Sequence, residues 1–148
     1  MLSIGELALK TGVKVPTIRY YEQMKLIDAP QRSRGNQRRY THREMEKLSF
    51  IKHARDLGFS IEAIRELLEL AAHPGKPCAE ADRIAQDHLE QVRLRIAQLQ
   101  SLEAELARIA SGCGRGRVDK CYVIRSLADH ALCTRPHDAP SALGKGKF

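Results

Sequence analysis

A long stretch without any helix-breaking residue constrains the fold of this chain more than any other feature. Residues 78–111 contain neither glycine nor proline, the two residues that most disfavour a helix interior. Spacings of three and four positions separate the apolar residues Ala85, Leu89, Val92, Ile96, Leu99, Leu102, Leu106 and Ile109, with a register shift at Leu102. This spacing is typical of a coiled coil, so we expect a helical rod of roughly 50 Å.

Such a rod needs a partner, because a single helix cannot bury its own apolar stripe. A second copy of the chain is the simplest partner, in a parallel or an antiparallel arrangement. The alternative is packing against the chain's own N-terminal segment, which is too small to cover this length. The absence of tryptophan and an aromatic content of 5% also favour an elongated helical fold over one large core.

The N-terminal segment has the pattern of a helix-turn-helix. Ser3 and Glu6 have the spacing of a capping box, and Gly12 is suited to end the first helix in a tight turn. Pro16 suits the first turn of a second helix. The stretch DAPQRSRGNQRRYT, residues 28–41, is rich in turn formers and arginine, which predicts a loop or a short β-hairpin.

Positive charge is concentrated in this hairpin and just after it. Residues 31–55 hold eight lysines and arginines against two glutamates, a local charge of +6 in a chain of net charge +7. We expect a second helix pair over residues 42–58 and 60–71, so part of the charge would lie on the first of these helices. A basic cluster of this kind is typical of a polyanion-binding surface, although a solvated basic face has the same composition.

A helix-turn-helix followed directly by a basic hairpin predicts DNA binding. The second helix would enter a major groove, and the hairpin would contact flanking phosphates as a wing. Tyr21 and Tyr40 fit the protein core equally well. The residues expected to contact DNA are Thr17, Arg19, Tyr20, Arg32, Arg34, Arg38, Arg39 and Arg55.

The four cysteines are expected to be reduced thiols. The charged N-terminal segment does not resemble a secretion signal, and no apolar run approaches the length of a membrane span, so we expect a cytoplasmic protein. Cys113 and Cys121 bracket a basic, glycine-rich loop in which positive charge favours the thiolate form. Such a pair suits either a soft metal ion or a reversible disulfide, and the charge does not decide between them.

In combination, three segments of the chain resemble the MerR (mercury-resistance regulator) family over about residues 3–133. They are IGELALKTGVKVPTIRYYEQMKLI, RSRGNQRRYT and IKHARDLGFSIEAIRELL, followed by the long helix and the cysteine loop. Gln37 departs from the pattern, because the wing of the family usually carries an aromatic residue there. The resemblance implies a mainly α-helical homodimer with an antiparallel coiled coil. Its expected parts are a winged helix-turn-helix domain (1–74), a dimerisation helix (78–111), a metal-binding loop with a short helix (112–133) and a flexible tail (134–148).

The resemblance also implies a function in transcription. Members of this family bind promoters with an over-long spacer between two RNA-polymerase recognition elements, and they switch from repressor to activator by distorting the DNA. Only 37 residues follow Ser111, so we do not expect the large ligand domain of the drug-responsive members. No nucleophile–base pair, phosphate loop or cofactor fingerprint indicates an enzyme.

A third cysteine indicates which effector to expect. In an antiparallel dimer, Cys78 of one chain would approach Cys113 and Cys121 of its partner, which resembles the zinc-, cadmium-, lead- and mercury-responsive branches. We therefore expect a divalent soft metal ion that activates an efflux or detoxification gene. A copper(I)-responsive regulator, or a thiol redox sensor using Cys113 and Cys121 alone, remains the alternative. An auxiliary metal site could involve His130, Cys133 and His137.

Overall fold

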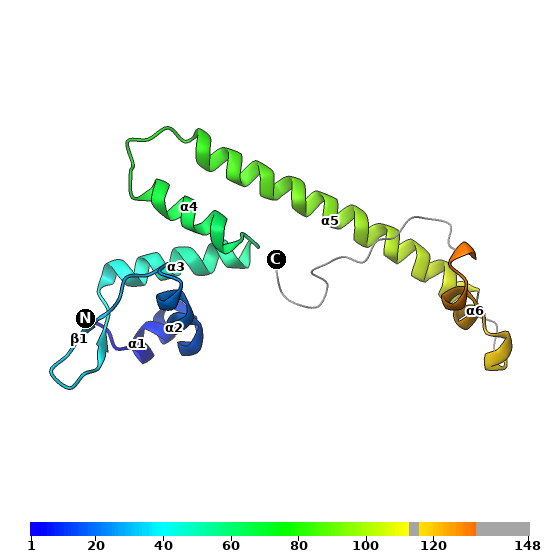
Figure 1. The fold of residues 1–148 in the computed structure, drawn as a ribbon, viewed down its shortest axis with the longest axis horizontal. Helices are drawn as coiled ribbons and strands as arrows, with labels where there is room; N and C mark the ends of the chain where they lie inside the picture. The colour runs from blue at the N-terminus through cyan, green and yellow to red at the C-terminus, as the bar shows by residue number, and fades with distance from the viewer. Residues whose placement is uncertain (113–115, 133–148) are drawn as a thin grey trace. The chain divides into compact units, whose positions relative to one another are not determined.

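The computed structural model describes residues 1–112 and 116–132. It divides into two compact units, the first comprising Met1–Ile84 and the second beginning at Ala85. Helices dominate both units, and the one described sheet has two short strands (Figure 1). The expectation of a mainly α-helical fold with a small winged element is confirmed. Among the helices of the described residues, none has the length and apolar character needed to cross a membrane.

The helix-turn-helix is formed by α1 (Ile4–Thr11) and α2 (Val15–Gln23). The predicted capping box is present: Glu6 N–H donates to Ser3 Oγ over 3.3 Å, and Ser3 N–H donates to Glu6 Oε2 over 2.7 Å. Gly12 ends α1 with φ of 71°, a left-handed conformation that residues with a Cβ rarely adopt. A proline lies in the first turn of α2, so the turn has the geometry that the sequence predicted.

A short hairpin follows the helix-turn-helix and projects from the helices (Figure 1). Its strands β1 (Gln31–Arg32) and β2 (Arg38–Arg39) are antiparallel, with Gln31 opposite Arg39 and Arg32 opposite Arg38. Beyond β2, the backbone of Tyr40 exchanges two hydrogen bonds of 2.8 Å with Leu2. The base of the wing is therefore fixed to the N-terminal residues of the same unit.

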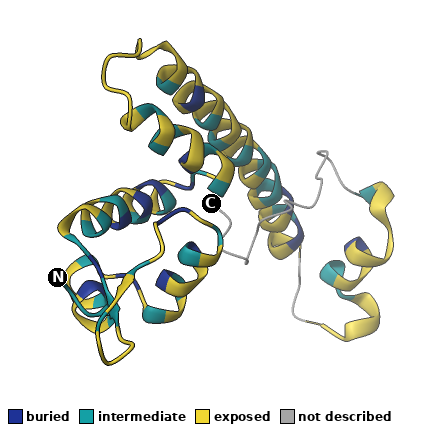
Figure 2. Cartoon of the chain, turned by 60° about the vertical axis from the view of Figure 1, so that its left-hand side comes forward, coloured by how far each residue is buried: buried dark blue, intermediate teal, exposed yellow. Residues whose placement is uncertain are grey.

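Two further helices complete the first unit. Thr41 and Glu44 form a capping box at the start of α3 (His42–Asp56), and Ser60 caps α4 (Ile61–Ala71) by accepting a hydrogen bond of 3.1 Å from the N–H of Ala63. Helix α1 contacts α2 and α3, and α3 contacts α4. Figure 2 shows that the buried positions lie on the facing sides of these helices. The largest fully buried side chains are those of Leu7, Ile18, Leu26, Ile27, Tyr40, Leu48, Ile51 and Ile64.

The predicted rod is one continuous helix, α5 (Ala79–Ser111), of 33 residues. Much of its predicted apolar stripe is exposed in the single chain (Figure 2), with 49% of Ile96 and 63% of Leu106 accessible to solvent. Burial of apolar side chains is the main force that stabilises tertiary structure. The exposed stripe is therefore the part of this helix that a partner would cover.

After α5 come the 3₁₀ turn η1 (Val118–Lys120), helix α6 (Tyr122–Ala128) and a second 3₁₀ turn, η2 (His130–Leu132). The apolar residues Val123, Ile124, Leu127 and Leu132 would fit one amphipathic helix over residues 122–132, but α6 ends at Ala128. Asp129 is extended, with φ of −131° and ψ of 103°. Its Oδ1 accepts a hydrogen bond of 3.0 Å from the N–H of Ala131, so the side chain competes with the helical bond pattern and α6 ends.

Candidate nucleic-acid interface and metal-binding cysteines

Helix α2 separates its core-facing residues from its polar ones. Ile18 is fully buried and Tyr21 is 7% exposed, whereas 46% of Tyr20 is accessible. Arg19 is exposed and Thr17 is half-buried. Of the two adjacent tyrosines, Tyr21 is therefore a core residue and Tyr20 is available to a ligand. The outer side of α2 carries the residue types expected of a helix that contacts DNA.

The wing carries exposed arginines near its tip. Arg34 is exposed, and Nη1 of the exposed Arg32 donates to Oδ1 of Asn36 over 2.9 Å. Asn36 has a positive φ of 59°, a conformation that asparagine tolerates better than most residues. The hydrogen bond between Arg32 and Asn36 and the left-handed conformation of Asn36 together define the turn at the tip of the wing. Arg39, on β2, is half-buried.

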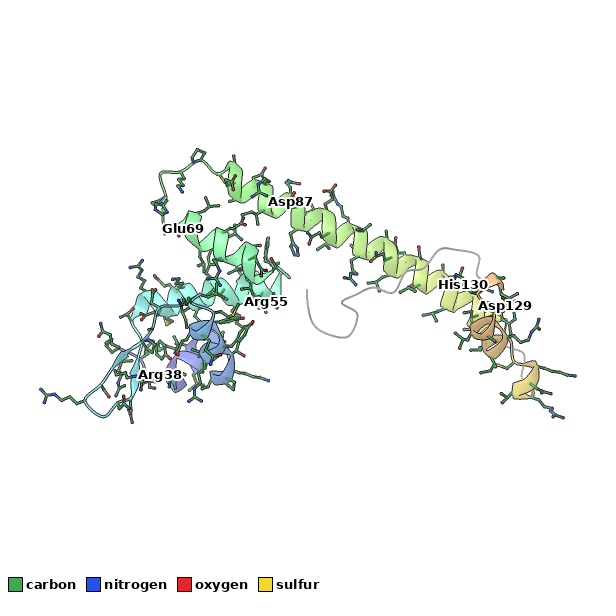
Figure 3. The ribbon with its side chains drawn as sticks, viewed as in Figure 1. Arg38, Arg55, Glu69, Asp87, Asp129 and His130 are labelled. Atoms are coloured by element: carbon green, nitrogen blue, oxygen red, sulfur yellow. The ribbon has the colours of Figure 1, made fainter. Side chains whose placement is uncertain are left out.

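Arg38 differs from the other wing arginines, because its charge is paired within the protein. Its Nε lies 3.3 Å from Oε2 of Glu22 at the end of α2, where the hairpin meets the helices (Figure 3). The other oxygen of Glu22 accepts a hydrogen bond from the hydroxyl of the buried Tyr40. Burial, and then this bond to the carboxylate, raise the pKa of Tyr40 above its usual range. Sequence reasoning missed Glu22, whose only signal is an acidic residue on an otherwise uncharged or basic helix.

Other basic residues of the 31–55 segment also have partners inside the first unit. Nη1 of Arg55 donates to the carbonyl oxygen of Phe59 over 2.7 Å and so supports the turn between α3 and α4 (Figure 3). Lys47 lies 3.7 Å from a carboxylate oxygen of Asp28, and Lys52 lies 2.8 Å from one of Asp56. The raw charge count therefore overstates the unpaired positive charge of this segment, whereas Arg19 of α2 and Arg32 and Arg34 of the wing are exposed.

The cysteines are distributed over both units. Cys78 is an exposed free thiol in the first unit, and its carbonyl oxygen accepts a 3.0 Å hydrogen bond from Asp82 N–H at the start of α5. Cys121 is half-buried in the second unit and directly precedes α6. His130 is exposed on η2, while Cys113, Cys133 and His137 lie outside the described residues. Within the described part of this single chain, no three metal-ligating side chains are gathered.

A cluster that the sequence did not reveal holds α6 against the end of α5. Nη2 of Arg108 lies 2.9 Å from Oε2 of the buried Glu105, and Nη1 of the same guanidinium donates to the hydroxyl of Tyr122. The ring of Tyr122 packs so closely on Gly112 that a Cβ at position 112 would lie 2.3 Å from ring atom Cδ1. Gly112 and Tyr122, which flank the segment from Cys113 to Cys121, are therefore in contact with each other.

Together, the capped helix pair, the outward-facing polar side of α2 and the arginine-bearing hairpin define a winged helix-turn-helix DNA-binding protein. Comparison with known proteins identifies the family. Residues 2–71 match the family model of the MerR HTH family regulatory proteins, and residues 45–109 match that of the MerR DNA-binding segment. The chain belongs to the MerR family of transcription regulators.

Three relatives show how far the similarity extends. The chain is 44% identical over 114 residues to the HTH-type transcriptional regulator ZntR of Escherichia coli (strain K12), which covers 76% of this chain and 81% of the relative. It is 39% identical over 128 residues to the mercuric resistance operon regulatory protein of Pseudomonas fluorescens, covering 85% of this chain and 87% of the relative. Among solved structures, the transcription regulator PbrR691 from Ralstonia metallidurans CH34 in complex with lead(II) matches with a TM-score of 0.77 and 35% identity, covering 86% of this chain and 99% of that chain.

Proposed function

We propose that this chain is a cytoplasmic, metal-sensing regulator that binds double-stranded promoter DNA as a homodimer. It would repress or activate a metal efflux or detoxification gene according to whether a divalent soft ion (zinc, cadmium, lead or mercury) is bound. It would act on RNA polymerase through the shape of the promoter rather than by catalysis. The observation that carries the proposal is the position of the cysteines before and after α5 in a chain similar to a mercuric resistance regulator and to a protein solved with lead(II).

The exposed stripe of α5 supports the homodimer. Leu89, Ile96, Leu99 and Leu106 are each at least 39% exposed in the single chain, and apolar residues at this spacing pack against a second helix of the same pattern. A second copy of α5 offers such a surface of matching length. An exchange of Leu99 for aspartate should therefore shift the protein from dimer to monomer in analytical ultracentrifugation.

An antiparallel pair of α5 helices would bring the metal ligands together. At 1.5 Å per residue, the 33 residues of α5 span about 50 Å, so the two ends of one helix cannot share an ion. The start of one helix would instead meet the end of its partner. The proposed ligands are Cys113 and Cys121 of one chain with Cys78 of the other, and His130, Cys133 and His137 are an auxiliary set.

The chemistry of these donors fits a soft divalent ion. Thiolates select thiophilic metals over magnesium or calcium, and three thiolates with one divalent ion carry a net charge of only −1. The exposed guanidinium of Arg117, near Cys121 in sequence, lies 3.3 Å from a carboxylate oxygen of Asp119 and so adds little net positive charge there. Ligands drawn from two chains would connect the ends of both α5 helices. Metal and DNA binding are coupled only if each of the two ligands binds two states of the dimer with different affinity.

A titration of the metal-free protein tests this proposal. Zinc(II), cadmium(II), lead(II), mercury(II) and copper(I) are added in competition with a chromophoric chelator, to the wild type and to Cys78→Ser. We expect the substitution to weaken divalent binding by more than about tenfold, since even the loss of a residue that only supports a ligand costs about 10–100-fold. His73→Ser, at an exposed residue outside the proposed ligand sets, serves as the control, with no change in divalent affinity expected.

Two results would contradict the proposal. Divalent affinity that is unchanged in Cys78→Ser removes this residue from the site, and a preference for copper(I) in both proteins identifies the other branch of the family. A chelator-treated sample exposed to peroxide tests the redox alternative, because a thiol switch would alter promoter binding without metal.

A further inference from the structure

A single carboxylate joins the α2 helix to the wing. Only 12% of the side chain of Glu22 is exposed, and its two oxygens face different donors. Oε2 lies 3.3 Å from Nε of Arg38, and Oε1 accepts a hydrogen bond from the hydroxyl of Tyr40. Arg38 and Tyr40 are two positions apart in an extended segment, so their side chains lie on the same side of it. Glu22 thus binds the side chains of both Arg38 and Tyr40.

The wing depends on such an attachment. Its strands are only two residues long each, and an isolated two-stranded hairpin is at best marginally stable in water. Tyr40 fixes the base of the wing to the core, and Arg38 is the next attachment outward. The exposed Arg34 is four residues before Arg38 in the chain, so at 3.3 Å per residue their backbones are at most about 13 Å apart. A small change of angle at the attachment is therefore magnified at the tip.

We propose that Glu22 is a positioning residue for DNA binding. Through Arg38 and Tyr40 it sets the distance and angle between α2 and the wing, so that the helix and the tip arginine can contact one duplex at the same time. The inference rests on the proposed DNA-binding function and adds to it a residue that does not itself touch the ligand. The same contact determines that Arg38 acts within the protein and leaves the outermost phosphate contacts to Arg34 and Arg32.

The sign of the effect separates this role from simple electrostatics. A carboxylate near a polyanion is repulsive, so a charge count alone predicts that Glu22→Gln tightens DNA binding. Positioning predicts the opposite, because the wing would lose its fixed place and its phosphate contacts with it. The logarithm of affinity falls as the logarithm of salt concentration rises, and each lost phosphate contact reduces the steepness of this fall by about 0.9.

A double-mutant cycle between Glu22 and Arg34 tests the proposal. The probe is a fluorescein-labelled duplex selected from a random-sequence pool by the full-length wild-type protein, with affinity measured by anisotropy over a range of salt concentrations. We expect Glu22→Gln and Arg34→Ala each to weaken binding and to reduce the salt slope by about one. In the Glu22→Gln background, Arg34→Ala should have little further effect. Glu62→Gln, the same charge change at an exposed position of α4, is the matched control.

Each outcome is decisive. Tighter or unchanged binding by Glu22→Gln, or fold-changes that simply multiply in the double variant, would overturn the positioning role. Circular dichroism and thermal midpoints establish that each variant is folded. Tyr40→Phe, which removes one of the two bonds and keeps the buried ring, replaces Glu22→Gln if that variant does not fold, with the same expected direction. A wild-type protein that selects no duplex overturns the proposed function itself, a result distinct from all of these.

Discussion

Replacing Gly112 by alanine should loosen α6, although alanine is the better helix former. Gly112 directly follows α5. Unlike Gly12 and Gly58, it does not have a positive φ, so its backbone conformation is compatible with a side chain. Without Tyr122 the exchange would favour the helix by up to about 1 kcal/mol. The added Cβ, however, would lie 2.3, 2.6 and 2.9 Å from three atoms of the Tyr122 ring, whereas the contacts of real Cβ atoms essentially never fall below 3.0 Å.

The ring must therefore move, and it loses its bond with Arg108 when it does. A hydrogen bond to a charged group contributes about 1.5–3 kcal/mol, so the net cost is about 0.5–2 kcal/mol after the gain in helix propensity. At a factor of ten per 1.4 kcal/mol, the hydrogen-exchange protection of the α6 amides should fall by about two- to thirty-fold. Mass spectrometry of peptic peptides that cover residues 122–128 measures this directly.

Two further variants make the result specific. Tyr122→Phe keeps the ring and removes only the bond to Arg108, so its effect should be similar in direction but without any clash. In Tyr122→Ala, a second exchange of Gly112 for alanine should become neutral or stabilising, because nothing then occupies the space. If Gly112→Ala alone increases the protection of α6, the packing of the Tyr122 ring on position 112 is not what holds this helix.

Three other predictions concern the first unit. Leu48 is fully buried, so Leu48→Ala should lower the free energy of unfolding by about 2–5 kcal/mol in chemical denaturation, whereas Leu57→Ala, at a position 58% exposed, should change it by less than about 0.5 kcal/mol. Thr41→Ala removes the cap of α3 and should cost about 1 kcal/mol, detectable as a lower thermal midpoint. Burial and the bond to Glu22 favour the neutral phenol of Tyr40 and so raise its pKa. The resulting contribution to the free energy of unfolding is complete below the ordinary tyrosine pKa of about 10. It is lost as the pH rises from there through the raised pKa. The wild type should therefore lose more stability than Tyr40→Phe in this range, and an ultraviolet titration should show one late-ionising tyrosine.

Local patterns were sufficient to predict helices α1 to α4 of the first unit, although α3 ends at Asp56 and not at residue 58. The capping box of α1 and the left-handed Gly12 depend on residues within about four positions of one another. Such signals act on the backbone directly and need no tertiary context. The exposed stripe of α5 followed from its spacing alone for the same reason.

The contacts that give individual side chains their roles needed the tertiary structure. Glu22 meets Arg38 and Tyr40 across 16 and 18 positions of sequence, and Arg108 meets Tyr122 across 14. The sequence predicted Arg38 as a phosphate ligand like its neighbours, and only the fold shows that its charge faces a carboxylate. Composition and periodicity record which residue types are present and on which face of a helix they lie. Which charges are paired is decided by the packing of α2, the wing and the helix ends, because a salt bridge requires two side chains to meet within about 4 Å.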